Sequence, residues 1–194
     1  YQYAEEDRAG VTPSDAEARR GSADNGVTYR YLKRVSYANT DMHQNPDLGG
    51  TGAFRLHLVL DYGDHNTSDP GLDPDQTWAA RQDVYSSFRS GFDIRCYRLC
   101  QRVLMFHSFT SLRSSADTPV PVVVRVLNLT YTERPTVSTL DQAQLQGWRW
   151  NGTDYDTAEL PAMSLVYVQP EIDETIQLVD GVDDLPAGLD TRPW

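Results

Sequence analysis

The segment Arg95–Phe109, with the sequence RCYRLCQRVLMFHSF, decides the fold of this chain. As an α-helix, it would place Leu99, Val103 and Phe106 on one face. As a β-strand, it would place the odd-numbered residues of 95–105 on one face, and most of those are apolar. Hydrophobic periodicity alone does not choose between the two, so the neighbouring segments must be considered.

The segments on either side have the patterns of β-strands. Val120–Tyr131 is rich in β-branched residues, which favour strands. Thr28–Tyr37 and Phe54–Tyr62 alternate in the manner of half-buried strands. In the second of these, we expect the face with the large apolar side chains to be the buried one. That face consists of Phe54, Leu56, Leu58 and Leu60, and the opposite face carries Arg55, His57 and Val59.

A β-hairpin is predicted further along the chain. Thr136–Trp150 has the pattern of a strand, and Asn151-Gly152 is a dipeptide typical of tight hairpin turns. Met163–Val168 is predicted to be another short strand. The chain is therefore predicted to be mostly β, with antiparallel strands joined by long loops.

The long loops bear on the domain organisation. We expect residues 1–194 to be a single segment of a larger protein, because loops of this length suggest a fold that neighbours complete. Within it we expect a loop-rich entry at 1–26, a β-rich body at 27–168 and an acidic, extended exit at 169–194. No signal peptide is expected in this segment, since its first residues are acidic and aromatic. No apolar run approaches the roughly 18 residues of a membrane span.

Charge is distributed in blocks. The chain has 17 basic and 28 acidic residues, and its net charge of −11 argues against a nucleic acid as partner. Residues 1–75 hold 13 acids and 7 bases, residues 76–149 hold 5 acids and 9 Arg, and residues 150–194 hold 10 acids and one Arg. Lys33 is the single Lys beside 16 Arg. Arg suits fixed bidentate ion pairs, although a GC-rich genome would produce the same preference.

Four arginines of the basic middle block lie close together in the sequence. They are Arg89, Arg95, Arg98 and Arg102. One interpretation is a row of Arg that faces solvent. The other is that some of them point inward, where they would need carboxylate or carbonyl partners, because an unpaired buried charge is costly. The acidic flanks would supply those partners.

Motifs for catalysis or metal binding are sparse. On a helix, Cys96 and Cys100 would share a face and could bind a metal with His57 or His107. On a strand they would lie roughly 13 Å apart, too far for a disulfide, so buried thiols are favoured. The Asp-rich segment 61–75 lacks the regular spacing of a calcium loop and is interpreted as a solvated, turn-rich loop.

No pattern of a nucleophile with its base, and no phosphate-binding loop, is found in the sequence. We therefore expect no catalytic residue, no cofactor and no metal, and predict that the chain is not an enzyme. The alternative is a free-standing β-rich module that binds carbohydrate or protein. In that alternative Trp148, Trp150 and Tyr155, around the predicted turn, would form a stacking platform.

Several motifs resemble those of one bacterial family. Tyr29–Asn39 (YRYLKRVSYAN), Asp61–His65 (DYGDH) and the long block Trp78–Phe109 occur in the same order as in SpvB-like proteins. These include the B components of the insecticidal toxin-complex (Tc) toxins. Later landmarks at 146–148 (QGW) and 185–190 (LPAGLD) also match. The main departure is at position 96, where the family has Thr.

The resemblance implies a fold and a role. B components of this family are large, β-rich proteins that carry a β-propeller and, with the C component, form a hollow shell of strands around a toxic cargo. This segment would be shell or scaffold between the SpvB region and the propeller, which favours a strand for 95–109. SpvB-type proteins can carry an ADP-ribosyltransferase in a distant carboxy-terminal domain. Its Glu-x-Glu pair is not matched by Glu171-Ile-Asp-Glu174.

The resemblance also implies partners and a location. Expected partners are the rest of the same B component, the C component and, through the propeller, the A component. The chain would be part of a secreted or exported bacterial toxin. The residues expected to have structural or interaction roles are Trp78, Arg89, Phe92, Arg95, Arg98, Arg102 and His107.

Overall fold

The computed structural model describes residues 1–12, 17, 29–39 and 54–168. The strands found in these residues are β1 (Gln2–Glu5), β2 (Arg30–Asn39), β3 (Phe54–Asp61), β4 (Tyr85–Ser87), β5 (Ile94–Cys96), β6 (Arg102–His107), β7 (Ser114–Ser115), β8 (Thr118–Pro119), β9 (Val122–Thr132), β10 (Thr139–Trp150), β11 (Tyr155–Glu159) and β12 (Met163–Ser164). Residues 13–16 and 18–26 of the predicted entry, and the whole predicted exit at 169–194, lie outside the described residues.

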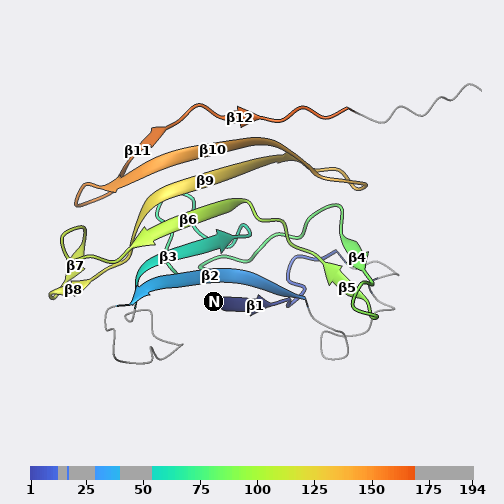
Figure 1. Ribbon diagram of the computed structural model, residues 1–194, viewed down its shortest axis with the longest axis horizontal. Helices are drawn as coiled ribbons and strands as arrows, with labels where there is room; N and C mark the ends of the chain where they lie inside the picture. Colours follow the sequence, from blue (N-terminus) through green and yellow to red (C-terminus); the bar gives the residue numbers. More distant parts are fainter. Residues whose placement is uncertain (13–16, 18–28, 40–53, 169–194) are drawn as a thin grey trace, which may run out of the picture.

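One eight-stranded sheet dominates the fold. Its strand order is β1-β2-β3-β6-β9-β10-β11, and β12 pairs with β10 beside β11 (Figure 1). All the pairs are antiparallel. The hairpins β4–β5 and β7–β8 are separate two-stranded sheets at opposite ends of the large sheet. The prediction of a mostly β, antiparallel fold is thus confirmed.

The predicted hairpin is present at the expected turn. Its turn joins β10 to β11, and Gly152 has φ +108°, which L-residues with side chains rarely adopt. The Asn151 side-chain oxygen accepts the backbone N–H groups of Thr153 and Asp154 at 3.0 and 2.9 Å. A turn of this kind can be predicted from sequence, because the side chain that accepts its backbone N–H groups belongs to the turn itself.

The continuous strand favoured for 95–109 is only partly correct. β5 ends at Cys96, β6 starts at Arg102, and the two strands belong to different sheets. Between them, the Tyr97 backbone N–H is donated to the Tyr31 hydroxyl at 2.9 Å instead of to a neighbouring strand. The chain leaves the strand path there because side chains of the connection make buried contacts with distant segments.

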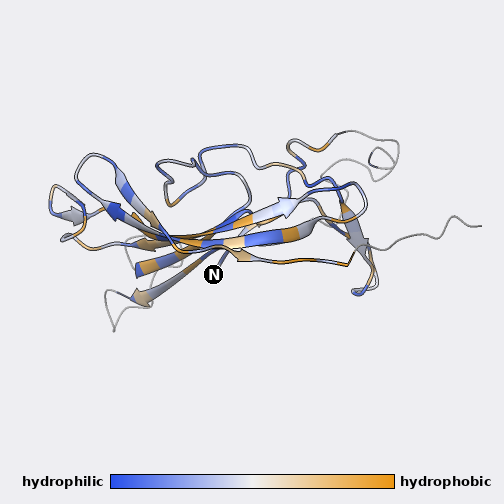
Figure 2. Cartoon of the chain, turned by 90° about the horizontal axis from the view of Figure 1, so that it is seen from above, coloured by the Kyte–Doolittle hydropathy of each residue, from blue (hydrophilic) through white to orange (hydrophobic). Residues whose placement is uncertain are grey.

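The first core cluster lies on one side of the large sheet, and the second is at one end of it. One cluster of buried side chains belongs to β3, β6 and β9, and consists of Val59, Leu104, Phe106, Val123 and Val126. A second cluster combines Tyr31, Tyr62, Trp78 and Cys96. Leu72 packs against the first cluster, so the irregular segment that follows β3 covers this face. Figure 2 shows the sheet edge-on, with irregular segments over one side along most of the strands.

The prediction of which face of β3 is buried is wrong. His57 and Asp61 are fully buried and Val59 is 1% exposed, whereas the opposite face, with Leu56 and Leu58, is only partly buried. The reason is that the irregular segment that follows β3, which contains Leu72, lies on the face that carries the polar residues. Likewise, Met163–Val168 contains a strand of only two residues, β12.

Candidate functional site

The turn that follows β3 is the centre of a buried ionic network. Asp61 accepts the backbone N–H groups of Gly63 and Asp64 at 2.8 and 3.0 Å, which closes the turn. The other Asp61 carboxylate oxygen lies 2.6 Å from Nε of Arg102 on β6. Arg102 also donates to the carbonyls of His65 and Asn66 at 2.9 and 3.0 Å. One arginine thus ties the turn to the centre of the sheet.

Lys33 and Asp64 form the second part of the network. Lys33 Nζ lies 2.7 Å from each Asp64 carboxylate oxygen and 3.4 Å from Nε2 of His65. The other nitrogen of His65, Nδ1, lies 3.1 Å from the Gly71 carbonyl. Burial and the Lys33 ammonium lower the pKa of His65. A neutral ring that donates from Nδ1 and accepts at Nε2 satisfies both contacts.

Arg98 forms the third part and is the most deeply buried cation described. Its guanidinium makes a bidentate ion pair with Glu6 and donates to the carbonyls of Ala9 and Trp78 at 2.7 and 3.0 Å. It also lies 4.5 Å from the centre of the Trp78 ring, and the indole N–H is donated to Asp7 at 2.7 Å. Arg98 therefore links residues 6–9 to Trp78, which lies in the irregular segment that follows β3.

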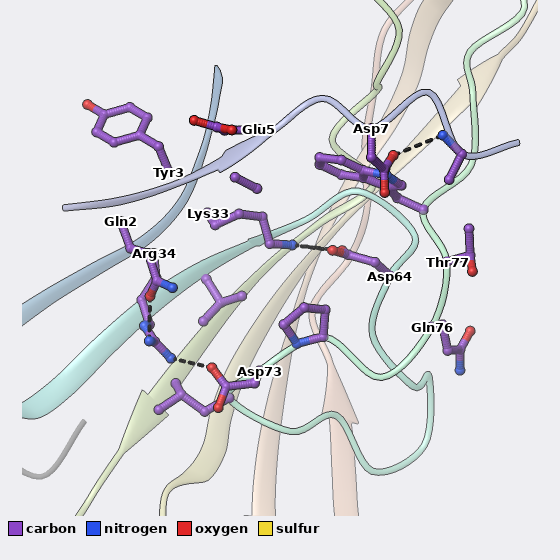
Figure 3. A pocket seen from close by; sticks show the side chains of 16 residues that line it. Gln2, Tyr3, Glu5, Asp7, Lys33, Arg34, Asp64, Asp73, Gln76 and Thr77 are labelled. Atoms are coloured by element: carbon purple, nitrogen blue, oxygen red, sulfur yellow. Dashed lines mark hydrogen bonds and ion pairs between the residues drawn. The ribbon is translucent and has the colours of Figure 1, made fainter. Parts of the chain in front are cut away.

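A cavity of about 410 Å³ opens beside this network (Figure 3). It lies between β1, β2 and the segment 72–78, and Val59, Leu72 and Trp78 contribute apolar surface. The charged side chains that line it are already in ion pairs. These pairs are Lys33–Asp64, Arg34–Asp73, Arg30–Glu5 and Arg98–Asp7. The cavity thus presents compensated charges.

The predicted site residues do not form one site. Arg98 and Trp78 are in contact, and Arg102 lies in the Asp61 turn. Arg95 pairs with a different carboxylate, that of Glu17, at 2.7 Å. The remaining predicted residues lie elsewhere: Arg89 and Phe92 in the exposed connection of the β4–β5 hairpin, and His107 at the end of β6.

The pairing interpretation of the arginines is the one that the structure supports. Arg95, Arg98 and Arg102 each pair with a carboxylate from residues 1–75, the first acidic flank. A solvent-facing row is excluded for Arg98, which is 2% exposed. The first acidic block and the basic middle block are therefore complementary at these three pairs.

The interpretation of 61–75 as a solvated loop is wrong at its start. Asp61, Asp64 and His65 are 0%, 5% and 2% exposed, because the cations of β2 and β6 draw them inward. Sequence reasoning also missed Glu6 and Lys33. One signal was available for Lys33, since it is the single Lys in a chain with 16 Arg.

The two cysteines are thiols. Cys96 is buried, Cys100 is partly buried, and both are free. Burial raises the pKa of the Cys100 thiol to about 11, so it is protonated at neutral pH. Among the described residues, no three His, Cys, Asp or Glu side chains are grouped so that they could hold a metal ion.

The aromatic residues of the β10–β11 hairpin pack against one another. The Tyr155 ring lies 5.2 Å from those of Trp148 and Trp150, inclined to them by 59° and 69°. Arg113 lies 4.1 Å from the centre of the Trp150 ring, and the Tyr155 hydroxyl accepts the Val123 backbone N–H at 3.3 Å. The three rings therefore pack on one another and do not lie in a shared plane.

The buried position of Lys33 leads to a first prediction. We expect an amine-reactive ester to modify Lys33 at least tenfold more slowly in the native chain than in urea, because Asp64 and His65 hold the ammonium in a buried site. Mass spectrometry of the peptide that contains Lys33 measures the rate, and the terminal amine serves as the internal reference. Equal rates in native and unfolded chains would contradict the buried ion pair.

The buried histidines lead to a second prediction. Burial, with nearby Arg34 for His57 and Lys33 for His65, lowers the pKa of both rings, so they stay neutral in the fold. Below the unfolded pKa of about 6.5, the unfolded chain binds protons that the native chain does not, so stability falls as the pH drops. We expect urea midpoints to decrease from pH 7.5 to pH 5.5, and less steeply in His65→Gln. A midpoint independent of pH over this range would show that the rings are not held neutral.

Together, the fold and the site define an all-antiparallel β-module in which buried ion pairs fix irregular segments to one face of a sheet. The matching family model is "SpvB: Salmonella virulence plasmid 65kDa B protein", and it covers residues 1–109, more than half of the chain. The chain belongs to the SpvB family. This confirms the resemblance that the sequence motifs indicated.

Among curated proteins, the chain is similar to "Mono(ADP-ribosyl)transferase SpvB" of Salmonella typhimurium and of Salmonella choleraesuis. It is 34% identical to each over 160 residues, which cover 78% of this chain and 26% of the relative. The chain thus spans about a quarter of the length of the curated relatives it matches.

Solved structures show the same similarity. A crystal structure of TcdB2-TccC3-TEV matches 86% of this chain and 8% of the other, with a TM-score of 0.72 and 32% identity. The Tc holotoxin pore of Photorhabdus luminescens matches the same shares, with a TM-score of 0.69 and 30% identity. The N-terminal domain of the effector protein SpvB from Salmonella typhimurium LT2 matches 77% of this chain and 46% of the other, with a TM-score of 0.62 and 31% identity.

Within the described residues, no helix has the length and apolar character needed to cross a membrane.

Proposed function

We propose that this chain is a non-catalytic structural segment of a bacterial toxin-complex B component, where it forms part of the β-sheet wall that encloses a toxic cargo. The observation that carries the proposal is the fold: the eight-stranded sheet matches part of the TcdB2-TccC3 structures over 86% of this chain at about 31% identity. A segment that makes up 8% of so long a chain is suited to be one piece of a large assembly.

The chemistry of the site supports an architectural role. Arg102 and Lys33 hold the segment that follows β3 to the sheet, and Arg98 holds residues 6–9 against Trp78, each through a buried carboxylate. Buried ion pairs of this kind are costly to desolvate and fix one arrangement of the chain rather than react. The Arg98, Arg102 and Lys33 side chains are therefore engaged in ion pairs that stabilise the fold.

The transferase name of the curated relatives is not carried over to this chain. The match covers 26% of those proteins, and the solved SpvB structure that it resembles is an N-terminal domain. We propose that any transferase activity in such proteins belongs to residues outside the matched part.

The partners follow from the same proposal. They are the rest of the B component, including its propeller and shell, the C component and, through the propeller, the A component of an exported toxin. In this arrangement residues 27–168 form the wall segment, with an entry at 1–26 and an acidic exit at 169–194. The exposed Phe88 and Phe92, with Arg89 between them, are the side chains of the β4–β5 hairpin best placed to contact a neighbour.

The experiment that tests the proposal separates assembly from catalysis. Residues 29–109 are deleted from the longer B component, which is then mixed with the C component. Size-exclusion chromatography measures complex formation, and a transferase assay measures catalysis. Loss of the complex supports the structural role, whereas an intact complex that has lost a catalytic activity would overturn it. A variant with exposed Ser114 and Ser115 deleted controls for nonspecific effects of shortening the chain.

A further inference from the structure

The face of the large sheet opposite the first core cluster is apolar at its centre, and at one end its Leu60 packs against the second cluster. Two cross-strand rows define this surface, which we call the uncovered face. Direct pairing places Val35, Leu58 and Met105 in one row, and Val103, Leu127 and Leu145 in the other. Met105 and Val103 are two residues apart on β6, so both rows lie on the same face.

The uncovered face is poorly suited to contact with water. All six side chains are apolar, and they lie on five adjacent strands in the middle of the sheet, yet each is only partly buried. An antiparallel sheet that faces solvent normally presents polar residues on that face. Here the polar residues His57 and Asp61 are on the covered face instead. Large contiguous apolar surfaces of this kind mark an interface.

The neighbouring residues delimit this surface. Arg125 extends the first row beyond Met105. His107 lies two residues after Met105 on β6, and burial together with nearby Arg125 lowers the pKa of its ring. At the far edge, Met163 is 64% exposed and pairs with Ala143 on β10. The apolar surface therefore continues across the sheet towards β12 and meets a charged group at Arg125.

We propose that a further β-layer of the same, longer polypeptide packs on the uncovered face. This inference rests on the proposed function in one respect, that the chain is part of a larger protein. The length of chain available supports it, because the matched region makes up 26% of the curated relatives and 8% of the TcdB2-TccC3 chain. A second sheet about 10 Å away would bury both rows by aligned sheet packing.

A second copy of this chain is a weaker candidate as occupant. Its net charge of −11 would bring two strongly acidic chains together on dimerisation. A layer of the same polypeptide, by contrast, is held at high effective concentration by the chain itself. We therefore assign the uncovered face to a layer of the same polypeptide, and binding of a second copy is a distinct result of the oxidation experiment.

Native methionine oxidation tests the proposal without any substitution. The longer B component and the 194-residue chain are each treated with hydrogen peroxide, and the Met105 sulfoxide is measured by mass spectrometry relative to the urea-unfolded protein. We expect Met105 to be oxidised at least tenfold more slowly in the longer protein than in the short chain. Equal rates would overturn the proposal. A rate that falls in the short chain as its concentration rises would point to a second copy and would also overturn it.

A charge substitution provides a second test, because it should benefit the 194-residue chain and harm the longer protein. Leu58→Lys should raise the solubility of the 194-residue chain, because it interrupts an exposed apolar surface, and should lower the thermal midpoint of the longer protein, because it buries an unpaired charge. Ser115→Lys, at an exposed site on β7, is the control and should change neither. A longer protein that tolerates Leu58→Lys as well as Ser115→Lys would overturn the proposal. These readouts do not use complex formation, so failure here is distinguishable from failure of the proposed function.

Discussion

Replacement of Arg98 by Met is expected to lower the free energy of unfolding by about 3–5 kcal/mol. The substitution leaves the Glu6 carboxylate buried without its cation and removes the donors to the Ala9 and Trp78 carbonyls. An uncompensated buried charge is among the most destabilising changes that a single substitution can produce. Urea unfolding followed by Trp fluorescence, at submicromolar protein concentration, measures the effect.

A matched pair on the surface is the control for this result. Arg149 and Asp156 form an ion pair on the β10–β11 hairpin, but the Arg149 side chain is 81% exposed. Arg149→Met should leave the urea midpoint unchanged within error, since exposed pairs contribute little. The double variant Glu6→Gln/Arg98→Met should lose less stability than the sum of its single variants. If Arg98→Met is as mild as Arg149→Met, the buried network does not hold the fold.

Phe106→Ala is the second substitution with a large expected effect. Phe106 is 1% exposed in the first core cluster, and removal of its ring should cost about 3–5 kcal/mol through lost burial and the cavity left behind. Met105, the preceding residue, points to the opposite face and is only partly buried. In the 194-residue chain, Met105→Ala should therefore cost clearly less than Phe106→Ala. The free energy of unfolding of both variants in urea is the measurement.

The same two variants give a further comparison in the longer protein. If a β-layer covers the sheet there, the cost of Met105→Ala should rise towards that of Phe106→Ala, whose surroundings do not change. Similar costs for the two variants already in the 194-residue chain would contradict the assignment of covered and uncovered faces.

The local features of the fold were predictable from sequence. The strands around 30–39, 54–61 and 122–132 follow from alternation and β-branched content. The turn at Asn151-Gly152 follows from a side chain of the turn that accepts the turn's own backbone N–H groups. Both signals are local, so distant contacts do not alter them. The charge blocks left two interpretations of the arginines open, and the structure supports the one in which Arg98 and Arg102 pair with the first acidic flank.

The features that were not predictable depend on contacts between distant segments. The strand expected over 95–109 is interrupted because Arg98 reaches residues that are about ninety positions away. The buried role of Asp61 and Asp64 depends on Arg102 and Lys33, which local composition cannot indicate. The buried face of β3 was predicted wrongly because alternation shows which face is apolar, not which face this chain itself covers.

Protease protection of the cargo tests the central claim, that this segment is wall rather than enzyme, most directly. The longer B component, with and without Arg98→Met, is assembled with a C component that carries the cargo, and the complex is exposed to protease. We expect the cargo to resist cleavage in the intact complex and to be cleaved at least tenfold faster when Arg98→Met loosens the wall. Equal protection by a B component that lacks residues 29–109 and still assembles would contradict it.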